Sequence, residues 1–260
     1  MKKQVCQDFS YYTFDGLATC SGMLHFVSSG ERNIGFTEDS GGPAICENRR
    51  LLARNVGFDP GVLVTAQQVH SSHVAVVTKV EAGKGAMDKR SRIPETDALV
   101  TNVADVCLMV LSADCVPVLL YDSQQRVIAA VHAGWRGTAA QIVLKTVQVM
   151  VDRFGCRAEQ IQAGIGPSIG KCCFEVDGEV ADVFRNLFPV RPDIVTEGKT
   201  TGKYQVDLWE ANRQELVEGG LLPDHIEIAG MCSVCHPDRF FSYRREGKAA
   251  GRFGAGIMLC

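Results

Sequence analysis

The chain has 260 residues, of which 46% are hydrophobic and 22% are charged, and its formal net charge at pH 7 is −3. These values are typical of a globular protein with a sizeable core and exclude a disordered chain. Because the net charge is slightly negative and the basic residues form no long run, we expect a small-molecule partner rather than nucleic acid or a membrane surface.

The N-terminal segment and the cysteines indicate the cellular compartment. The lysines at positions 2–3 are not followed by an apolar segment, so no signal peptide is predicted. The most apolar region is interrupted by Asp105, Asp114 and Asp122 before it reaches the roughly 18 residues that a membrane span needs. The 11 cysteines favour reduced thiols, with a metal, over a disulfide framework. We therefore expect a cytoplasmic protein and infer no obligate protein partner.

Strands and helices alternate along the chain. Short strands are expected before residue 42, at 23–27 and 33–36, and a helix over 43–57 begins with Pro43 and ends at Gly57. The other predicted elements are strands at 62–69, 74–80, 97–100, 106–111, 116–121 and 126–131, a helix at 139–154, a strand at 161–165, a helix at 177–188, a strand at 204–208, a helix at 209–217, and strands at 226–229 and 251–259. Thr138 is the expected N-cap of the helix at 139–154. Hairpins among these strands favour an α/β fold, as a single layered domain over residues 1–260 with mixed β-sheets and flanking helices.

A hairpin in the middle of the chain brings together two residues that can bind a metal. Two short apolar runs flank the polar residues 122–125, a pattern typical of paired antiparallel strands. If the turn is centred on Ser123 and Gln124, Cys115 and His132 lie directly opposite each other, with Cβ atoms about 4.5–5.5 Å apart. At that spacing a thiolate and an imidazole can share one zinc ion, since Zn–S is about 2.3 Å and Zn–N about 2.0–2.1 Å.

His70, at the end of a predicted strand, completes a candidate zinc site. Three protein ligands with an open fourth position are typical of catalytic zinc. In the alternative interpretation Cys115 is an ordinary buried thiol and the histidines are hydrogen-bonded loop residues. The polar residues nearby, Asp114, Arg136 and Ser71, favour the metal.

A second cysteine motif lies near the C-terminus. His225-Ile-Glu227 followed by Cys232-Ser-Val-Cys235 is similar to the signature of zinc nucleobase deaminases, H-x-E and P-C-x-x-C. The two halves are almost contiguous here, and Met231 replaces the proline. We therefore expect this C-x-x-C to be structural or incidental.

Anion-binding residues are the third group of candidates. The glycine-rich segment 164–171 departs from the P-loop pattern, so a tight turn is expected there. Arg49, Arg136 and Arg244 are the candidate anion ligands, because guanidinium groups match phosphate geometry.

Several strings together resemble one known family, the YfiH-type proteins. These are also called multicopper polyphenol oxidase or laccase-domain proteins, purine nucleoside phosphorylases and peptidoglycan editing factors. The resemblance covers nearly the whole chain. It rests on Glu47-Asn-Arg-Arg50, Gln68-Val-His70, Thr96-Asp-Ala-Leu-Val100, Ala113-Asp-Cys-Val-Pro-Val118, His132-Ala-Gly-Trp-Arg-Gly137, Gly166-Pro-Ser-Ile-Gly170 with Cys173, and Phe240-Phe-Ser-Tyr-Arg-Arg245.

The resemblance implies a fold, a metal and an activity. It implies that zinc is bound by His70, Cys115 and His132, in a fold similar to the catalytic domain of cytotoxic necrotizing factor, a Cys-His deamidase. The implied activity is phosphorolysis of adenosine, inosine and S-methyl-5′-thioadenosine, with adenosine deamination. Where the family shows Ser-Leu-Asn-Leu-Gly, this chain has Glu31-Arg-Asn-Ile-Gly35, in which only Asn33 and Gly35 match. Of these, Asn33 is the expected substrate contact.

Three hypotheses follow for the function. In the first, a zinc-dependent phosphorylase, Arg49 and Arg136 bind phosphate and Glu175 acts as acid or base. In the second, a Cys-His hydrolase, Cys115 is the nucleophile and His132 the base, with an amide or a peptidoglycan precursor as substrate. The third is a copper-dependent polyphenol oxidase, for which six mostly scattered histidines are few.

Overall fold

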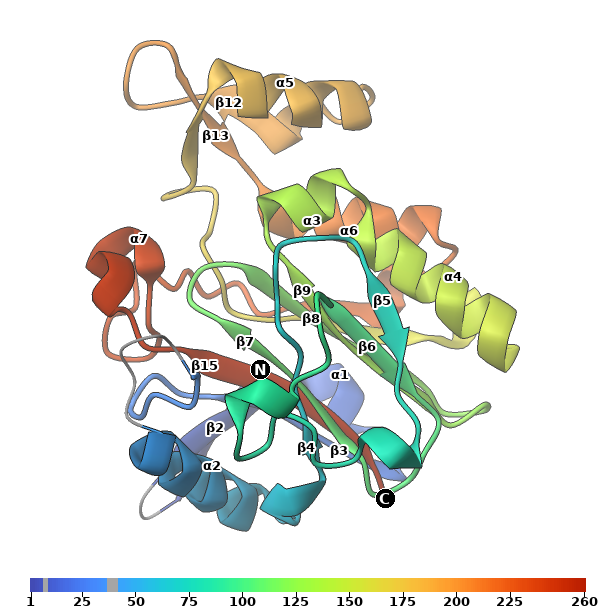
Figure 1. Ribbon diagram of the computed structural model, residues 1–260. Helices are drawn as coiled ribbons and strands as arrows, with labels where there is room; N and C mark the ends of the chain where they lie inside the picture. Colours follow the sequence, from blue (N-terminus) through green and yellow to red (C-terminus); the bar gives the residue numbers. More distant parts are fainter. Residues whose placement is uncertain (7–8, 37–41) are drawn as a thin grey trace.

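The structure is a computed structural model, and it describes residues 1–6, 9–36 and 42–260. Within these residues, two six-stranded sheets pack against each other and helices cover their outer faces (Figure 1). The strands of the first sheet are, in spatial order, β1 (Lys2–Val5), β2 (Ser10–Thr13), β3 (Met23–Ser28), β15 (Phe253–Leu259), β7 (Cys107–Ser112) and β4 (Leu63–Val64). The strands of the second are β14 (Ile226–Ile228), β10 (Gln162–Ile165), β8 (Val116–Asp122), β9 (Val127–Ala133), β6 (Ala98–Thr101) and β5 (Val74–Val76).

Both sheets are mixed, which confirms the predicted α/β class. In the first sheet β4 runs parallel to β7 and the other pairs are antiparallel. In the second, β5 and β14 each pair in parallel with a neighbour. The outer face of the first sheet is covered by α2 (Gly42–Val56), and that of the second by α3 (Trp135–Ala139), α4 (Ile142–Phe154) and α6 (Leu208–Glu218).

The central strands are buried on both faces. In β9, Ile128 and Ala130 pack toward the first sheet, whereas Ala129 and Val131 pack toward α4. All four side chains are fully buried. A strand enclosed on both sides needs a continuous apolar run, which is the pattern that the sequence shows here.

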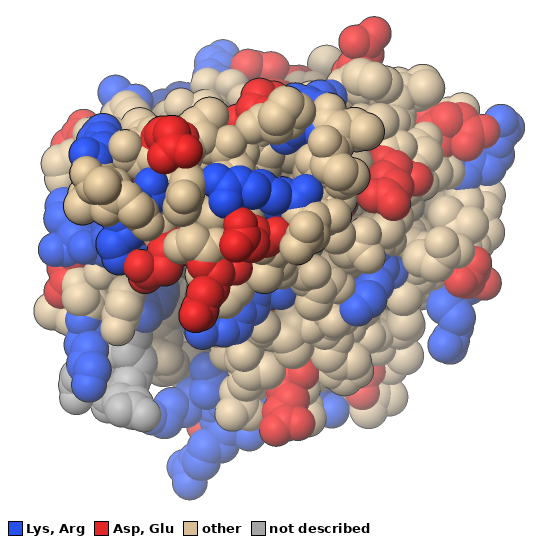
Figure 2. Space-filling model, turned by 90° about the horizontal axis from the view of Figure 1, so that it is seen from above, with Lys and Arg blue, Asp and Glu red and all other residues tan. Residues whose placement is uncertain are grey.

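A smaller lobe stands above the second sheet (Figure 1). Its three strands are β11 (Glu175–Asp177), β13 (Lys203–Val206) and β12 (Val195–Glu197), and they pack against α5 (Gly178–Leu187). Two short helices belong to connections between strands: α1 (Asp15–Ala18) lies between β2 and β3, and α7 (Tyr243–Glu246) lies between β14 and β15. Seen from the side of this lobe, basic and acidic side chains are interspersed (Figure 2).

The predicted register of the β8–β9 hairpin is wrong. Asp122 pairs with Val127 and Pro117 with His132, so the loop spans residues 123–126. Every partner is displaced by two residues from the prediction. Because side chains alternate with a period of two, the displacement leaves each side chain on its expected face.

The side chain of Asp122 explains this register. Its Oδ1 accepts hydrogen bonds from the backbone N–H groups of Gln124, at 2.8 Å, and Gln125, at 3.1 Å. Arg126 closes the loop with a positive φ of 51°. An aspartate that caps its own turn in this way stabilises a longer loop than a two-residue turn.

The helix predicted at 139–154 begins later than expected. Gln141, with φ 58°, separates α3 from α4, and Thr138 is buried within α3 rather than capping the longer helix. The first amides of α4 instead donate to the carboxylate of Glu215 on α6. A cap that comes from another helix leaves no local signal in the sequence.

Other predicted elements match in position with small changes. The helices at 43–57, 177–188 and 209–217 correspond to α2, α5 and α6. The strand at 62–69 shortens to β4, and the described residues 33–36 form no strand. None of the helices in the described part of the chain combines the length and apolarity that a membrane span requires.

Candidate metal centre

Three residues that are distant in sequence converge at one end of the second sheet. Cys115 directly precedes β8, His132 lies on β9, and His70 lies in the loop between β4 and β5. One ligand atom from each lies within 4.8 Å of the other two. The two imidazole rings meet edge to face, with centroids 5.0 Å apart. The predicted trio is therefore brought together, in a geometry that can hold a metal ion.

Asp97 orients one of the three candidate ligands. Its Oδ1 lies 2.8 Å from His132 Nδ1, and both side chains are buried. With Nδ1 occupied, the other ring nitrogen of His132 faces Cys115. A carboxylate behind a histidine in this way fixes the tautomer and orientation that metal binding needs.

The loop that carries His70 is shaped around the same carboxylate. The backbone N–H groups of Val69, His70 and Ser71 donate to Asp97 at 3.2, 3.1 and 2.7 Å. The Ser71 hydroxyl donates as well, at 2.8 Å. His70 has a φ of 61°, and such left-handed backbone curls successive amides around an anion. Asp97 thus holds His70 through the backbone and His132 through the ring.

The charges at the site favour a thiolate. Burial raises the pKa of the Cys115 thiol, but the imidazoles of His132 and His70 outweigh it and hold the pKa below its usual value. Burial also raises the pKa of Asp97, but hydrogen bonds from His132 and Ser71 bring it to about 2. The thiolate is the form of cysteine that binds metals and attacks electrophiles.

Gly134 leaves room for the side chains of Cys115 and His70, because it has no Cβ atom. A Cβ atom at this position would lie 2.8 Å from Cys115 Sγ and 3.0 Å from His70 Cδ2. Its backbone angles are ordinary, so the requirement for glycine comes from space.

The trio opens into a cavity of about 620 Å³. This volume suits a small ligand, since such sites measure about 300–1,000 Å³. Its apolar lining includes Phe36, Leu111, Trp135, Ile169, Phe174 and Tyr243, and its basic lining consists of Arg92, Arg244 and Arg252. A cavity with aromatic walls and guanidinium groups can hold a flat heterocycle together with an anion.

Two residues predicted to bind substrate or phosphate lie outside this lining. Arg49 is 1% exposed, and its guanidinium donates to the backbone carbonyls of Ile34, Gly85 and Ala86. Asn33 Oδ1 accepts from Gly35 N and from Arg252 N, at 3.0 and 2.9 Å. Arg49 therefore joins two loops beneath the cavity wall, and Asn33 holds the backbone of a lining residue.

Arg136 and Glu175, the other two residues predicted to take part in binding or catalysis, also lie outside the cavity lining. Arg136 is exposed and stacks on the ring of Trp135, with Cζ 4.3 Å from the centroid. Glu175, on β11, accepts hydrogen bonds from the backbone of Lys199 and Thr200 and from the Thr200 hydroxyl. It caps a turn of the small lobe and does not line the cavity.

Three residues of the site could not be identified from the sequence. Asp97 lies within one of the family strings, where a predicted strand begins, but no sequence pattern gives it a role. Arg92 lies between the strands predicted at 74–80 and 97–100, where no element was predicted. Arg252 is the second residue of the strand predicted at 251–259, and no pattern marked its side chain. The three residues share one sequence feature, a charged side chain at the end of a strand or loop. This feature alone does not indicate a functional site, because the fold is needed to show which of these ends meet.

Comparison with known proteins identifies the family. A family model described as multi-copper polyphenol oxidoreductase laccase matches residues 24–260. A purine nucleoside phosphorylase of Bacteroides thetaiotaomicron is 35% identical to this chain in an alignment that covers 98% of each protein. Adenosine deaminase RL5 from an unknown prokaryotic organism is 39% identical over 82% of this chain and 81% of its own length. The crystal structure of YlmD from Geobacillus stearothermophilus has a TM-score of 0.91 at 31% identity, over 98% of this chain and 97% of that chain. These matches show that the chain belongs to the multi-copper polyphenol oxidoreductase laccase family.

Proposed function

We propose that this protein is a zinc-dependent purine nucleoside phosphorylase that acts on adenosine, inosine and S-methyl-5′-thioadenosine and also deaminates adenosine. The observation that carries the proposal is the trio of His70, Cys115 and His132, which opens into a cavity lined by aromatic side chains and arginines. The names of the relatives, purine nucleoside phosphorylase and adenosine deaminase, support this substrate class. We place the reaction in the cytoplasm, where thiols stay reduced.

The donor set of the trio fits zinc. Two imidazoles and one thiolate are borderline-soft ligands, and three protein ligands leave a position for a substrate or water. When bound, zinc would act as a Lewis acid that favours the ionisation of water at neutral pH. A multicopper cluster needs more histidines than the two in this group, so zinc is favoured over copper.

The cavity walls support the proposal of a purine nucleoside as substrate. Trp135, Phe174 and Tyr243 offer flat apolar surfaces for a purine. Arg244, whose side chain approaches the Phe174 ring with Cζ 5.6 Å from the centroid, is placed to bind phosphate. A phosphate held next to the ribose can form a bond from one of its oxygens to C1′ as the bond between C1′ and the base breaks. Positive charge develops on the sugar during this step. We assign this role to Arg244 and to a second lining arginine, Arg92, in place of Arg49 and Arg136.

The experiment is an incubation of purified, zinc-loaded protein with adenosine, with and without inorganic phosphate. Chromatography should show adenine and a ribose phosphate with phosphate present, and inosine in either case. Replacement of Arg244 with Ala should reduce the phosphate-dependent product more than the inosine. The phosphorylase proposal fails if no adenine appears from protein that contains zinc.

A second candidate function has its own support. Cys115, His132 and Asp97 form a chain of nucleophile, base and orienting carboxylate, which is the arrangement of Cys-His hydrolases. In that case the substrate would be an amide or a peptidoglycan precursor. Chelation separates the two functions, because a thiolate bound to zinc is a poor nucleophile. Activity that survives a chelator and is abolished by iodoacetamide would select the hydrolase.

A further inference from the structure

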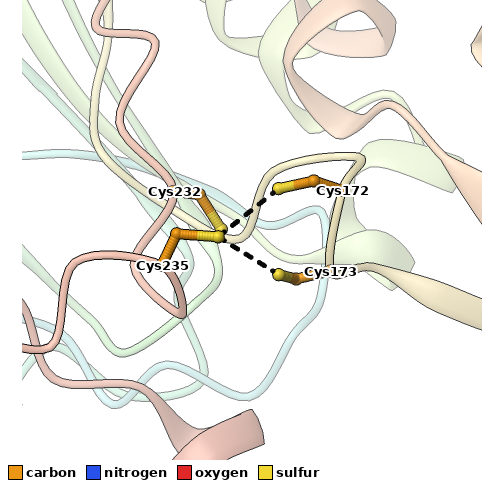
Figure 3. A group of neighbouring side chains, drawn as sticks. All are labelled: Cys172, Cys173, Cys232 and Cys235. Atoms are coloured by element: carbon orange, nitrogen blue, oxygen red, sulfur yellow. Dashed lines mark hydrogen bonds between the residues drawn. The ribbon is translucent and has the colours of Figure 1, made fainter.

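A second group of metal-ligand side chains lies away from the first centre. Cys172 and Cys173 belong to the loop after β10, and Cys232 and Cys235 to the loop after β14. Their four sulfurs lie within 4.8 Å of one another, and all four thiols are free. The side chains point into one space between the two loops (Figure 3). We propose that these four cysteines bind a structural zinc ion.

Two of the distances between the sulfurs are close to those of a tetrahedral site. Cys235 Sγ lies 3.7 Å from Cys172 Sγ and 3.5 Å from Cys173 Sγ. In a tetrahedral site with Zn–S bonds of about 2.3 Å, neighbouring sulfurs lie about 3.8 Å apart. Four sulfur ligands leave no open position, which is the pattern of structural rather than catalytic zinc. Hard cations such as magnesium prefer oxygen ligands.

The backbone holds the two loops together independently of the cysteine side chains. Ser168 forms a parallel bridge with Cys232, in which Ser168 N donates to Met231 O and Ser233 N to Ser168 O. The Gly170 N–H donates to Cys232 Sγ at 3.3 Å. Amide donors to sulfur stabilise a thiolate ligand and orient it. The site is therefore largely formed before a metal binds.

Cationic side chains bind the same two loops. Lys199 and Arg244 donate to the carbonyls of Cys172 and Cys173, at 3.2 and 3.1 Å, and Arg245 donates to Ser233 O at 2.8 Å. Zinc with four thiolates carries a net charge of about −2, which nearby cations stabilise. The charge distribution thus favours the loaded site.

The metal would fix one wall of the substrate cavity. Ile169 and Phe174 flank the first cysteine pair and line the cavity. Arg244, also in the lining, is held by Cys173 O and by the carboxylate of Asp114, which accepts from Arg244 N at 2.6 Å. Asp114 is adjacent to the ligand Cys115. The four-cysteine site would therefore support the cavity without supplying a ligand to the open centre.

Zinc content tests the proposal without any assay of activity. Elemental analysis should give two zinc ions per parent chain, one in Cys115→Ala and one in the double variant Cys172→Ser, Cys235→Ser. Cys260→Ser, which removes an exposed cysteine outside the group, should keep both. Cobalt-loaded Cys115→Ala should retain intense thiolate charge-transfer and tetrahedral bands, and the double variant should lose most of that intensity.

The outcomes separate the two metal centres. If Cys115→Ala keeps all the zinc of the parent and the double variant loses it, the four-cysteine site stands and the zinc-dependent function fails. If Cys115→Ala contains no zinc, or the double variant keeps as much as the parent, the four-cysteine site is refuted. A disulfide between Cys235 and either Cys172 or Cys173 in freshly purified protein, seen by mass spectrometry, would also refute it. One iron instead of zinc would contradict the assignment of the metal.

Discussion

Replacement of Asp97 with Asn tests how the metal centre is organised. The carboxylate of Asp97 accepts hydrogen bonds from four donors of residues 69–71 and interacts with His132 Nδ1, at 2.7 to 3.2 Å. Asparagine has a similar shape but offers one acceptor oxygen and an NH₂ group. Whichever way the amide is turned, its NH₂ group meets groups that also donate.

The two orientations of the amide have different costs. With NH₂ toward Ser71, three hydrogen bonds to the loop are lost. With NH₂ toward His132, the imidazole must accept at Nδ1, and its proton moves to the nitrogen that faces Cys115. A protonated nitrogen cannot bind a metal. Either orientation therefore weakens the centre.

The expected loss of zinc affinity is about 10- to 100-fold, the usual effect of removing such a supporting group. This corresponds to about 1.4–2.7 kcal/mol of binding free energy. Because buried donors lose their partner, the free energy of unfolding should also fall by about 1–3 kcal/mol.

The assay is competition for zinc with a chromophoric chelator, on parent and Asp97→Asn, together with chemical denaturation. Asp182→Asn is a matched control, because that exposed aspartate pairs with Arg185 on the surface of α5. Unchanged zinc affinity in Asp97→Asn would refute the reasoning that Asp97 orients the ligands.

Two further predictions concern space and protonation. Gly134→Ala should lose zinc from the open centre while the fold is retained, because its Cβ would lie 2.8 Å from Cys115 Sγ; a variant that holds this zinc as tightly as the parent would contradict the geometry. His25 Nε2 accepts the Phe14 N–H at 2.8 Å, and burial lowers the pKa of His25 to about 4. Between pH 6.5 and 4 the unfolded chain binds a proton that the folded chain does not, so stability falls as the pH falls. From pH 7 to pH 5 the parent should lose about 2 kcal/mol more unfolding free energy than His25→Gln, measured by chemical denaturation, and a difference independent of pH would refute this assignment.

Elements that are marked by patterns of neighbouring residues were predicted correctly from the sequence. The continuous apolar runs of β8 and β9 and the proline and glycine that bracket α2 were sufficient to place these elements. The hairpin register was not predictable in the same way, because it depends on the Asp122 side chain binding the amides of its own loop. The start of α4 depends on Glu215, more than 70 residues away.

The residues of the candidate site also differ in whether the sequence alone identifies them. His70, Cys115 and His132 were predicted to converge from their residue types at strand ends and from the hairpin, and the structure brings their ligand atoms within 4.8 Å of one another although the hairpin register differs by two residues. Arg49, predicted to bind phosphate, lies buried against three carbonyls, and the sequence does not distinguish such an arginine from one that faces solvent. The cysteine pairs at 172–173 and 232–235 lie about 60 residues apart, and only the fold brings them together.

The most direct test of the central claim combines zinc content and adenine release on the same preparations of parent and Cys115→Ala. The parent should release adenine from adenosine only with phosphate present. Cys115→Ala should lose one zinc per chain and all phosphate-dependent release but should still fold and unfold cooperatively in a thermal melt, because the large core and not this metal holds the fold together. If Cys115→Ala keeps all its zinc and yet releases no adenine, Cys115 acts as something other than a metal ligand, and the account is contradicted.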